Sequence, residues 1–104
     1  MSFDIDTTIT GMISAISEVI PGDWEGVKDC VEKALKEEKE ALSDIAAARL
    51  AGDINDEEMK SQLEDEKVAL EAAFLACQVK AKVMAQNAAN AAITVLKNAI
   101  KATI

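Results

Sequence analysis

The second half of the chain contains no residue that normally breaks a helix. The last glycine of the whole chain is Gly52, and the only proline, Pro21, lies far upstream. Because glycine and proline are the strongest local breaks in secondary structure, the chain should have few elements, and they should be long. Apolar residues recur at three- and four-residue intervals, as in helices that bury one face. The sequence therefore predicts an all-α protein.

A short first helix is predicted over residues 6–20. Ile9, Met12 and Ile16 fall on one face of this segment, and Asp6 is placed to cap its N-terminus. Residues 3–9 also alternate between apolar and polar, so a strand is the alternative for this opening. Pro21 ends the segment.

Two further helices are predicted, over residues 24–51 and 56–101. Gly52 is a suitable residue just beyond the end of the second helix. Asn55 and Glu58 form a capping-box pattern at the start of the third helix, with Ile54 placed to contact Met59. Since no break follows, the third helix would be about 46 residues and roughly 69 Å long.

The lengths of these helices suggest how they pack. The second helix, at roughly 42 Å, is too short to cover the third, and the first helix fills the gap. In an antiparallel arrangement Cys30 faces Cys77 and Ala34 faces Ala73. We therefore expect a single domain, residues 1–104, forming a long antiparallel helical hairpin of three helices whose first arm is kinked at Pro21. The alternative folds the first helix back into a compact three-helix bundle.

The two cysteines are predicted to be packed thiols. Neighbouring helices lie about 8–10 Å apart, whereas a disulfide joins Cα atoms about 4.4–6.8 Å apart. A disulfide or redox switch is the alternative if the arms are unusually close. The spacing of Cys30 and Cys77 matches no zinc or redox motif.

The net charge of the chain limits the classes of molecule that it can bind. The net charge is −8, so neutralisation of phosphates by lysine and arginine cannot dominate binding, and nucleic acid is not expected as a ligand. The N-terminus lacks the pattern of a secretory signal, and no apolar run reaches the roughly 18 residues of a transmembrane segment. We expect a cytoplasmic protein.

The sequence offers no catalytic, cofactor or metal site. It contains no histidine, which removes Ser-His-Asp and Cys-His catalysis and the histidine-bearing metal motifs. Residues 53–64 resemble a calcium-binding loop in part, but Glu58 stands where that loop needs glycine. No enzyme activity, cofactor or metal is therefore predicted.

The last third of the chain is predicted to mediate self-association into a dimer or larger assembly. From Ala72 onward apolar residues cover most of the helix circumference. This apolar surface is too wide for a single partner helix to bury. A narrow polar stripe that includes Asn87 and Asn90 is interpreted as a solvated edge, with a buried row that sets register between subunits as the alternative. The proposed contact residues are Met84, Ala88, Ala91, Ala92, Val95, Leu96 and Ile100.

These features favour a non-enzymatic helical protein-interaction module that assembles with itself or with another helical protein. One alternative is a small acidic inhibitor or immunity-type protein that covers a basic enzyme site with Glu25, Asp29 and Glu32. Another is a lipid-surface binder that uses the cationic, apolar C-terminal helix.

Overall fold

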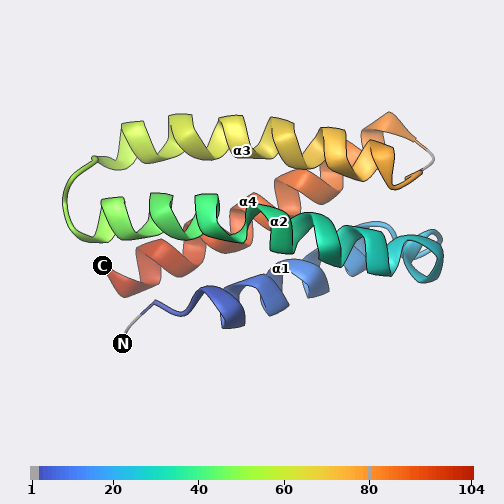
Figure 1. Cartoon of the computed structure of the whole chain (residues 1–104), viewed down its shortest axis with the longest axis horizontal. Coiled ribbons are helices and arrows are strands. Elements are labelled where there is room, and N and C mark those ends of the chain that lie inside the picture. The colour runs from blue at the N-terminus through green and yellow to red at the C-terminus, as the bar shows by residue number, and fades with distance from the viewer. Residues whose placement is uncertain (1–2, 80) are drawn as a thin grey trace.

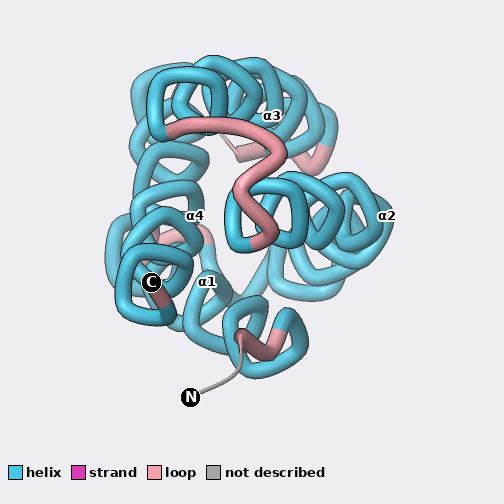
Figure 2. The backbone as a smooth tube through the Cα atoms, turned by 90° about the vertical axis from the view of Figure 1, so that its left-hand side faces the viewer, coloured by secondary structure: helices cyan, strands magenta, loops and turns pink. Residues whose placement is uncertain are grey.

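Four helices form the chain in the computed structural model, which describes residues 3–79 and 81–104. They are α1 (Ile5–Val19), α2 (Trp24–Leu50), α3 (Asp56–Ala76) and α4 (Lys82–Thr103). Consecutive helices run in opposite directions (Figure 1). Seen end-on, one helix stands at each corner of a four-helix bundle (Figure 2), which measures 39 × 24 × 19 Å. The described ranges contain no strand, so the all-α prediction is confirmed.

The predicted single helix over 56–101 is wrong, because the chain reverses after Ala76. Gln78 has a φ of 68°, in the left-handed region. Its N–H donates to the Leu75 carbonyl at 3.0 Å, and the Val79 N–H donates to the Phe74 carbonyl at 3.3 Å. These two bonds are the Schellman motif that ends many helices, usually with glycine at the left-handed position. With glutamine there, the sequence shows no visible stop.

The predicted three-helix hairpin with a kinked first arm is also wrong. The turn at Pro21 reverses the chain, so α1 and α2 lie antiparallel instead of forming one arm (Figure 1). α1 packs most extensively on α4. The two helices are in contact at Gly11, where a Cβ atom would lie 3.4 Å from Cγ1 of Val95. The first helix therefore folds back, as in the compact alternative, but into a bundle of four helices.

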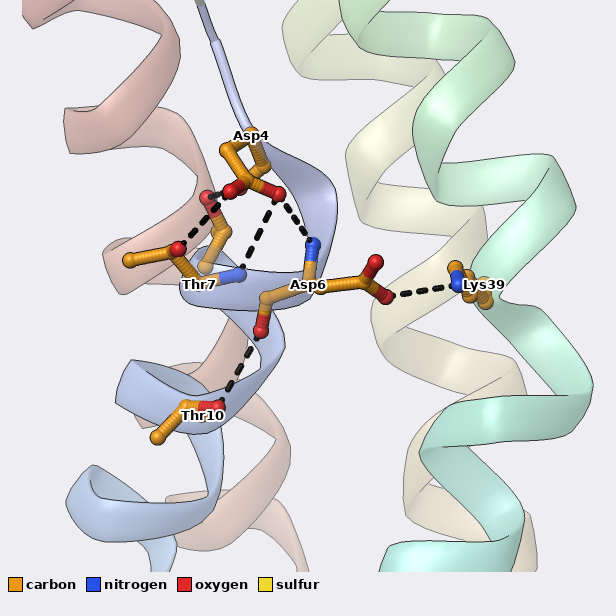
Figure 3. Close-up of polar contacts among 6 residues, drawn as sticks. Asp4, Asp6, Thr7, Thr10 and Lys39 are labelled. Atoms are coloured by element: carbon orange, nitrogen blue, oxygen red, sulfur yellow. Dashed lines mark hydrogen bonds and ion pairs between the residues drawn. The ribbon is translucent and has the colours of Figure 1, made fainter.

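The N-terminus of α1 is capped by Asp4 instead of the predicted Asp6. The Asp4 carboxylate accepts hydrogen bonds from the Asp6 N–H at 3.0 Å and from the Thr7 hydroxyl at 2.9 Å (Figure 3). The hydroxyls of Thr8 and Thr10 donate to main-chain carbonyls four residues earlier. These local bonds accommodate a threonine-rich opening within the helix, so the strand alternative does not apply.

The predicted start of α3 is confirmed in detail. The Glu58 N–H donates to Asn55 Oδ1 at 2.8 Å, and the Asn55 N–H donates to Glu58 Oε1 at 3.1 Å. Met59 is fully buried, with Ile54 half-buried beside the core. Gly52, with a φ of 81°, follows the end of α2. Local sequence therefore specifies the α2–α3 turn well.

The core runs the length of the bundle and is built mainly from aliphatic side chains. Its largest fully buried members come from all four helices and the Ile20 turn: Phe74, Met12, Ile16, Ile20, Leu35, Leu42, Met59, Leu63, Leu70, Leu96, Ile100 and Val31. Burial of each such side chain contributes about 1.5–3 kcal/mol before conformational entropy is counted. Within the described residues, no helix is both long and apolar enough to cross a bilayer.

Candidate interaction surface

The residues predicted to mediate self-association lie on the inner side of α4. Four are buried within the single chain, Ala88, Ala92, Leu96 and Ile100. The other three, Met84, Ala91 and Val95, are half-buried. The chain's own α1 covers much of this apolar surface, so the excess apolar area does not by itself require a second chain. Asn87 and Asn90 are exposed, as the solvated-edge interpretation predicts.

The acids proposed to face a basic partner lie on α2. Glu25 and Asp29 are exposed, whereas Glu32 is half-buried. Lys28 and Lys33 are also exposed on this helix and interrupt the acidic surface. The surface of α2 is therefore of mixed charge here, and the three acids do not form a concentrated negative patch.

Sequence reasoning missed an apolar stripe on the outside of α3. Val68 is 59% exposed and Leu75 is 39% exposed, and Ala72 lies exposed between them. Spacings of four and three residues place these side chains on one helix face. The fully buried Leu70 and Phe74 lie on the opposite face. α3 is therefore apolar on two faces in its C-terminal half, and the seven-residue spacing of Val68 and Leu75 was the available signal.

Charge is unevenly distributed around this stripe, which we call the α3 stripe (Val68, Ala72 and Leu75). Glu64 and Asp65 are exposed on the N-terminal side, and Glu64 pairs with Lys67 at 2.8 Å. The sequence contains no acid after Glu71. At the end of the bundle where α3 stops, α4 begins with exposed Lys82 (Figure 1).

A carboxyl pair lies between α2 and α3. Burial of Glu66, together with hydrogen bonding to Glu38 and repulsion from it, raises the pKa of Glu66 to about 7. Its Oε2 atom is buried and has no hydrogen-bond partner among the described residues. A proton on Glu66 makes this carboxyl neutral and able to donate a hydrogen bond, so the buried position and the raised pKa agree.

A disulfide joins α2 to α3, so the prediction of two packed thiols is wrong. Cys30 and Cys77 are bonded, with their Cα atoms 5.6 Å apart. Ala34 and Ala73 line the groove beside the disulfide. Cα atoms lie about 2.3 Å from their helix axis, so facing Cα atoms of helices at ordinary axial spacing are close enough for a disulfide. The predicted pairing of Cys30 with Cys77 across the arms is correct. Cys30 is exposed and Cys77 is 9% exposed.

A groove of about 490 Å³ lies between α1 and α2. Ile9 and Ile13 contribute apolar surface to it, and Lys36 contributes charge. The ion pair between Asp6 and Lys39, at 2.6 Å, spans the two helices beside it (Figure 3). In the part of the chain that the structure describes, no three or more Cys, Asp or Glu side chains are grouped to hold a metal ion.

Comparison with known proteins gives no match among protein-family models, curated proteins or solved structures.

Proposed function

We propose that the chain is a non-enzymatic helical interaction module that associates with a second copy of itself through the α3 stripe. The observation that carries this proposal is the exposure of Val68 and Leu75 on the helix face opposite the core. Residues of the chain itself leave this apolar surface in contact with water. A partner helix that covers it would gain hydrophobic burial.

A second copy fits the charge around the stripe. In a twofold-symmetric pairing with the two α3 helices antiparallel, the acidic side, with Glu64 and Asp65, would approach the end of the other chain that bears Lys82. Opposite charges would meet at both ends of the interface, which favours this orientation over a parallel one. Because a single helix face is a small contact area, the dimer should be weak and concentration-dependent.

The test is a molar-mass measurement over a wide concentration range, by sedimentation or light scattering. Wild type should shift from monomer towards dimer as concentration rises. Val68→Glu with Leu75→Glu should weaken the association by at least about 100-fold, because both changes would bury charge at the interface. The double variant should keep its helical circular dichroism, since both positions are exposed.

Ile104→Glu provides the matched control. Ile104 is 65% exposed and lies at the C-terminus, at the other end of the bundle from the α3–α4 turn (Figure 1). The control should leave the association unchanged. A wild type that stays monomeric at all concentrations, or a stripe variant that dimerises as well as wild type, would refute the proposal.

The cytoplasmic location expected from the sequence remains a prediction. Disulfides are rare in reducing compartments, so the bond between Cys30 and Cys77 favours an oxidising environment instead. Thiol alkylation of the protein in its native cells, followed by mass measurement, will show which form is present there.

A further inference from the structure

The turn between α3 and α4 is held by the surrounding structure more than by its own sequence. Gln78 has a φ of 68°, a conformation that disfavours any residue with a Cβ atom. Ala81, the N-cap of α4, has no side-chain acceptor for the free N–H groups of the first turn. The α2–α3 turn differs on both points, since it has Gly52 in the left-handed region and a capping box at Asn55.

α4 and α1 depend on each other for burial. The inner face of α1 includes Met12 and Ile16, both fully buried, and α1 packs more extensively on α4 than on α2. The inner face of α4 includes Ala92 and Leu96, also fully buried. If α4 moved away, both faces would be exposed. The inner face of α4 is the surface that covers α1 in the bundle. The α4 helix of a second copy of this chain has the same inner face and could cover α1 in the same way.

α1 and α4 are in direct contact at Gly11. A Cβ atom there would lie 3.4 Å from Cγ1 of Val95, which is van der Waals contact distance. Elsewhere along α4, the small residues Ala85, Ala88 and Ala89 are buried in the same bundle core. An identical α4 restores these contacts and the buried core, whereas an unrelated helix does not carry the same side chains at the same positions, which favours a second copy of this chain.

We propose that α4 exchanges between two copies of the chain, with the turn opening at Gln78. In the resulting domain-swapped dimer, each α4 packs on the other copy's α1 and rebuilds the same core contacts. Opening relieves the left-handed conformation of Gln78, and the native α1–α4 contacts are kept. The inference goes beyond the proposed function, because it uses the inner face of α4 instead of the α3 stripe.

A variant with two added cysteines can detect this exchange directly. Gly11→Cys with Val95→Cys, in the otherwise intact chain, places two thiols across the α1–α4 contact. Mild oxidation should link them within one chain in the closed form and between two chains in the exchanged form. Denaturing electrophoresis without reductant separates these products by mass, and peptide mapping confirms that positions 11 and 95 are joined. Each single-cysteine variant controls for random collision between chains.

The fraction of exchanged dimer should depend on the protein concentration and on the residue at position 78. After the protein is refolded at high concentration, an inter-chain link should form, and it should become rarer on refolding at low concentration. Gln78→Gly removes the strain of the turn and should lower the exchanged fraction at least about fivefold, whereas Gln78→Ala, which keeps the Cβ atom, should leave it unchanged. Both variants change an exposed side chain, and circular dichroism will check their folding.

The result that would overturn the inference is exclusively intra-chain linkage at every concentration, with both glutamine and alanine at position 78. Val68→Glu with Leu75→Glu, added to the paired-cysteine variant, should leave the inter-chain link intact, because exchange does not use the α3 stripe. A dimer of the paired-cysteine variant, with Val68 and Leu75 unchanged, that gives intra-chain links alone would refute exchange and leave the proposed function standing.

Discussion

Glu66 illustrates how one residue in a helix seam can make a bundle sensitive to pH. Its side chain is half-buried between α2 and α3, where it meets Glu38, with Asp65 adding further repulsion. Together these effects raise the pKa of Glu66 from 4.5 to about 7 in the folded chain. The folded state therefore binds this proton more tightly than the unfolded state does.

We predict that the free energy of unfolding decreases as pH rises from about 5 to about 8. The Glu66 contribution is present in full below the unfolded pKa of 4.5, and it is lost as pH rises through about 7. Glu66→Gln should flatten this part of the profile and stabilise the protein at the alkaline end, because the amide carries no charge. Urea unfolding across the pH range measures both effects.

The same change at an exposed acid on α2, Glu40→Gln, is the matched control. It reduces net charge equally but should keep the downward slope, since Glu40 is absent from the interactions that raise the Glu66 pKa. A Glu66→Gln profile that parallels wild type throughout would contradict the assignment to this carboxyl pair.

At the scale of the helix, the two caps that precede α2 and α3 make different contributions. Asn55 exchanges two hydrogen bonds with Glu58, whereas the side chain of Asp23, the N-cap of α2, makes no capping bond. We predict that Asn55→Ala lowers the free energy of unfolding by about 1 kcal/mol and that Asp23→Ala changes it much less. Urea denaturation of the two variants compares them directly, and equal losses would contradict the cap assignment.

How far an element could be predicted depended on whether its ends were set by local chemistry. The start of α3 and the end of α2 were predictable, because Asn55, Glu58 and Gly52 are the residues that such ends usually have. The break after α3 was not predictable, because Gln78 adopts a conformation that glutamine rarely takes. Tertiary contacts hold that turn, including those of buried Val79, whose N–H makes one of the two Schellman bonds.

The prediction that the inner face of α4 is a self-association surface depended on the missed break after α3. With the chain read as one long helix, the apolar residues of 72–104 had no cover, and the inner face of α4 was interpreted as an interface. Once the chain reverses, α1 covers that face, and the α3 stripe becomes the exposed apolar surface. The disulfide was not predicted for a different reason: the spacing of about 8–10 Å is measured between helix axes, whereas facing Cα atoms lie closer together, here 5.6 Å apart.

At the scale of the whole molecule, the disulfide links the first part of α2 to the end of α3, where the chain turns into α4. The cysteines are 47 residues apart in sequence, so the bond closes a long loop in the unfolded chain. In the chain-entropy account, a loop of this length contributes about 4 kcal/mol by restricting the unfolded state. That is a large share of the roughly 5–15 kcal/mol by which a domain is usually stable.

We therefore predict that a phosphine reductant lowers the free energy of unfolding by about 2–4 kcal/mol, measured by urea denaturation with and without reductant. Helical circular dichroism should persist in the absence of urea, because the core side chains of all four helices remain. Cys30→Ala with Cys77→Ala should match the reduced protein and should not respond to reductant. Since Cys30 is exposed, the reductant should reach the bond without prior unfolding. Identical unfolding curves for wild type with and without reductant, despite full thiol labelling of the reduced sample, would show that the bond does not stabilise this bundle.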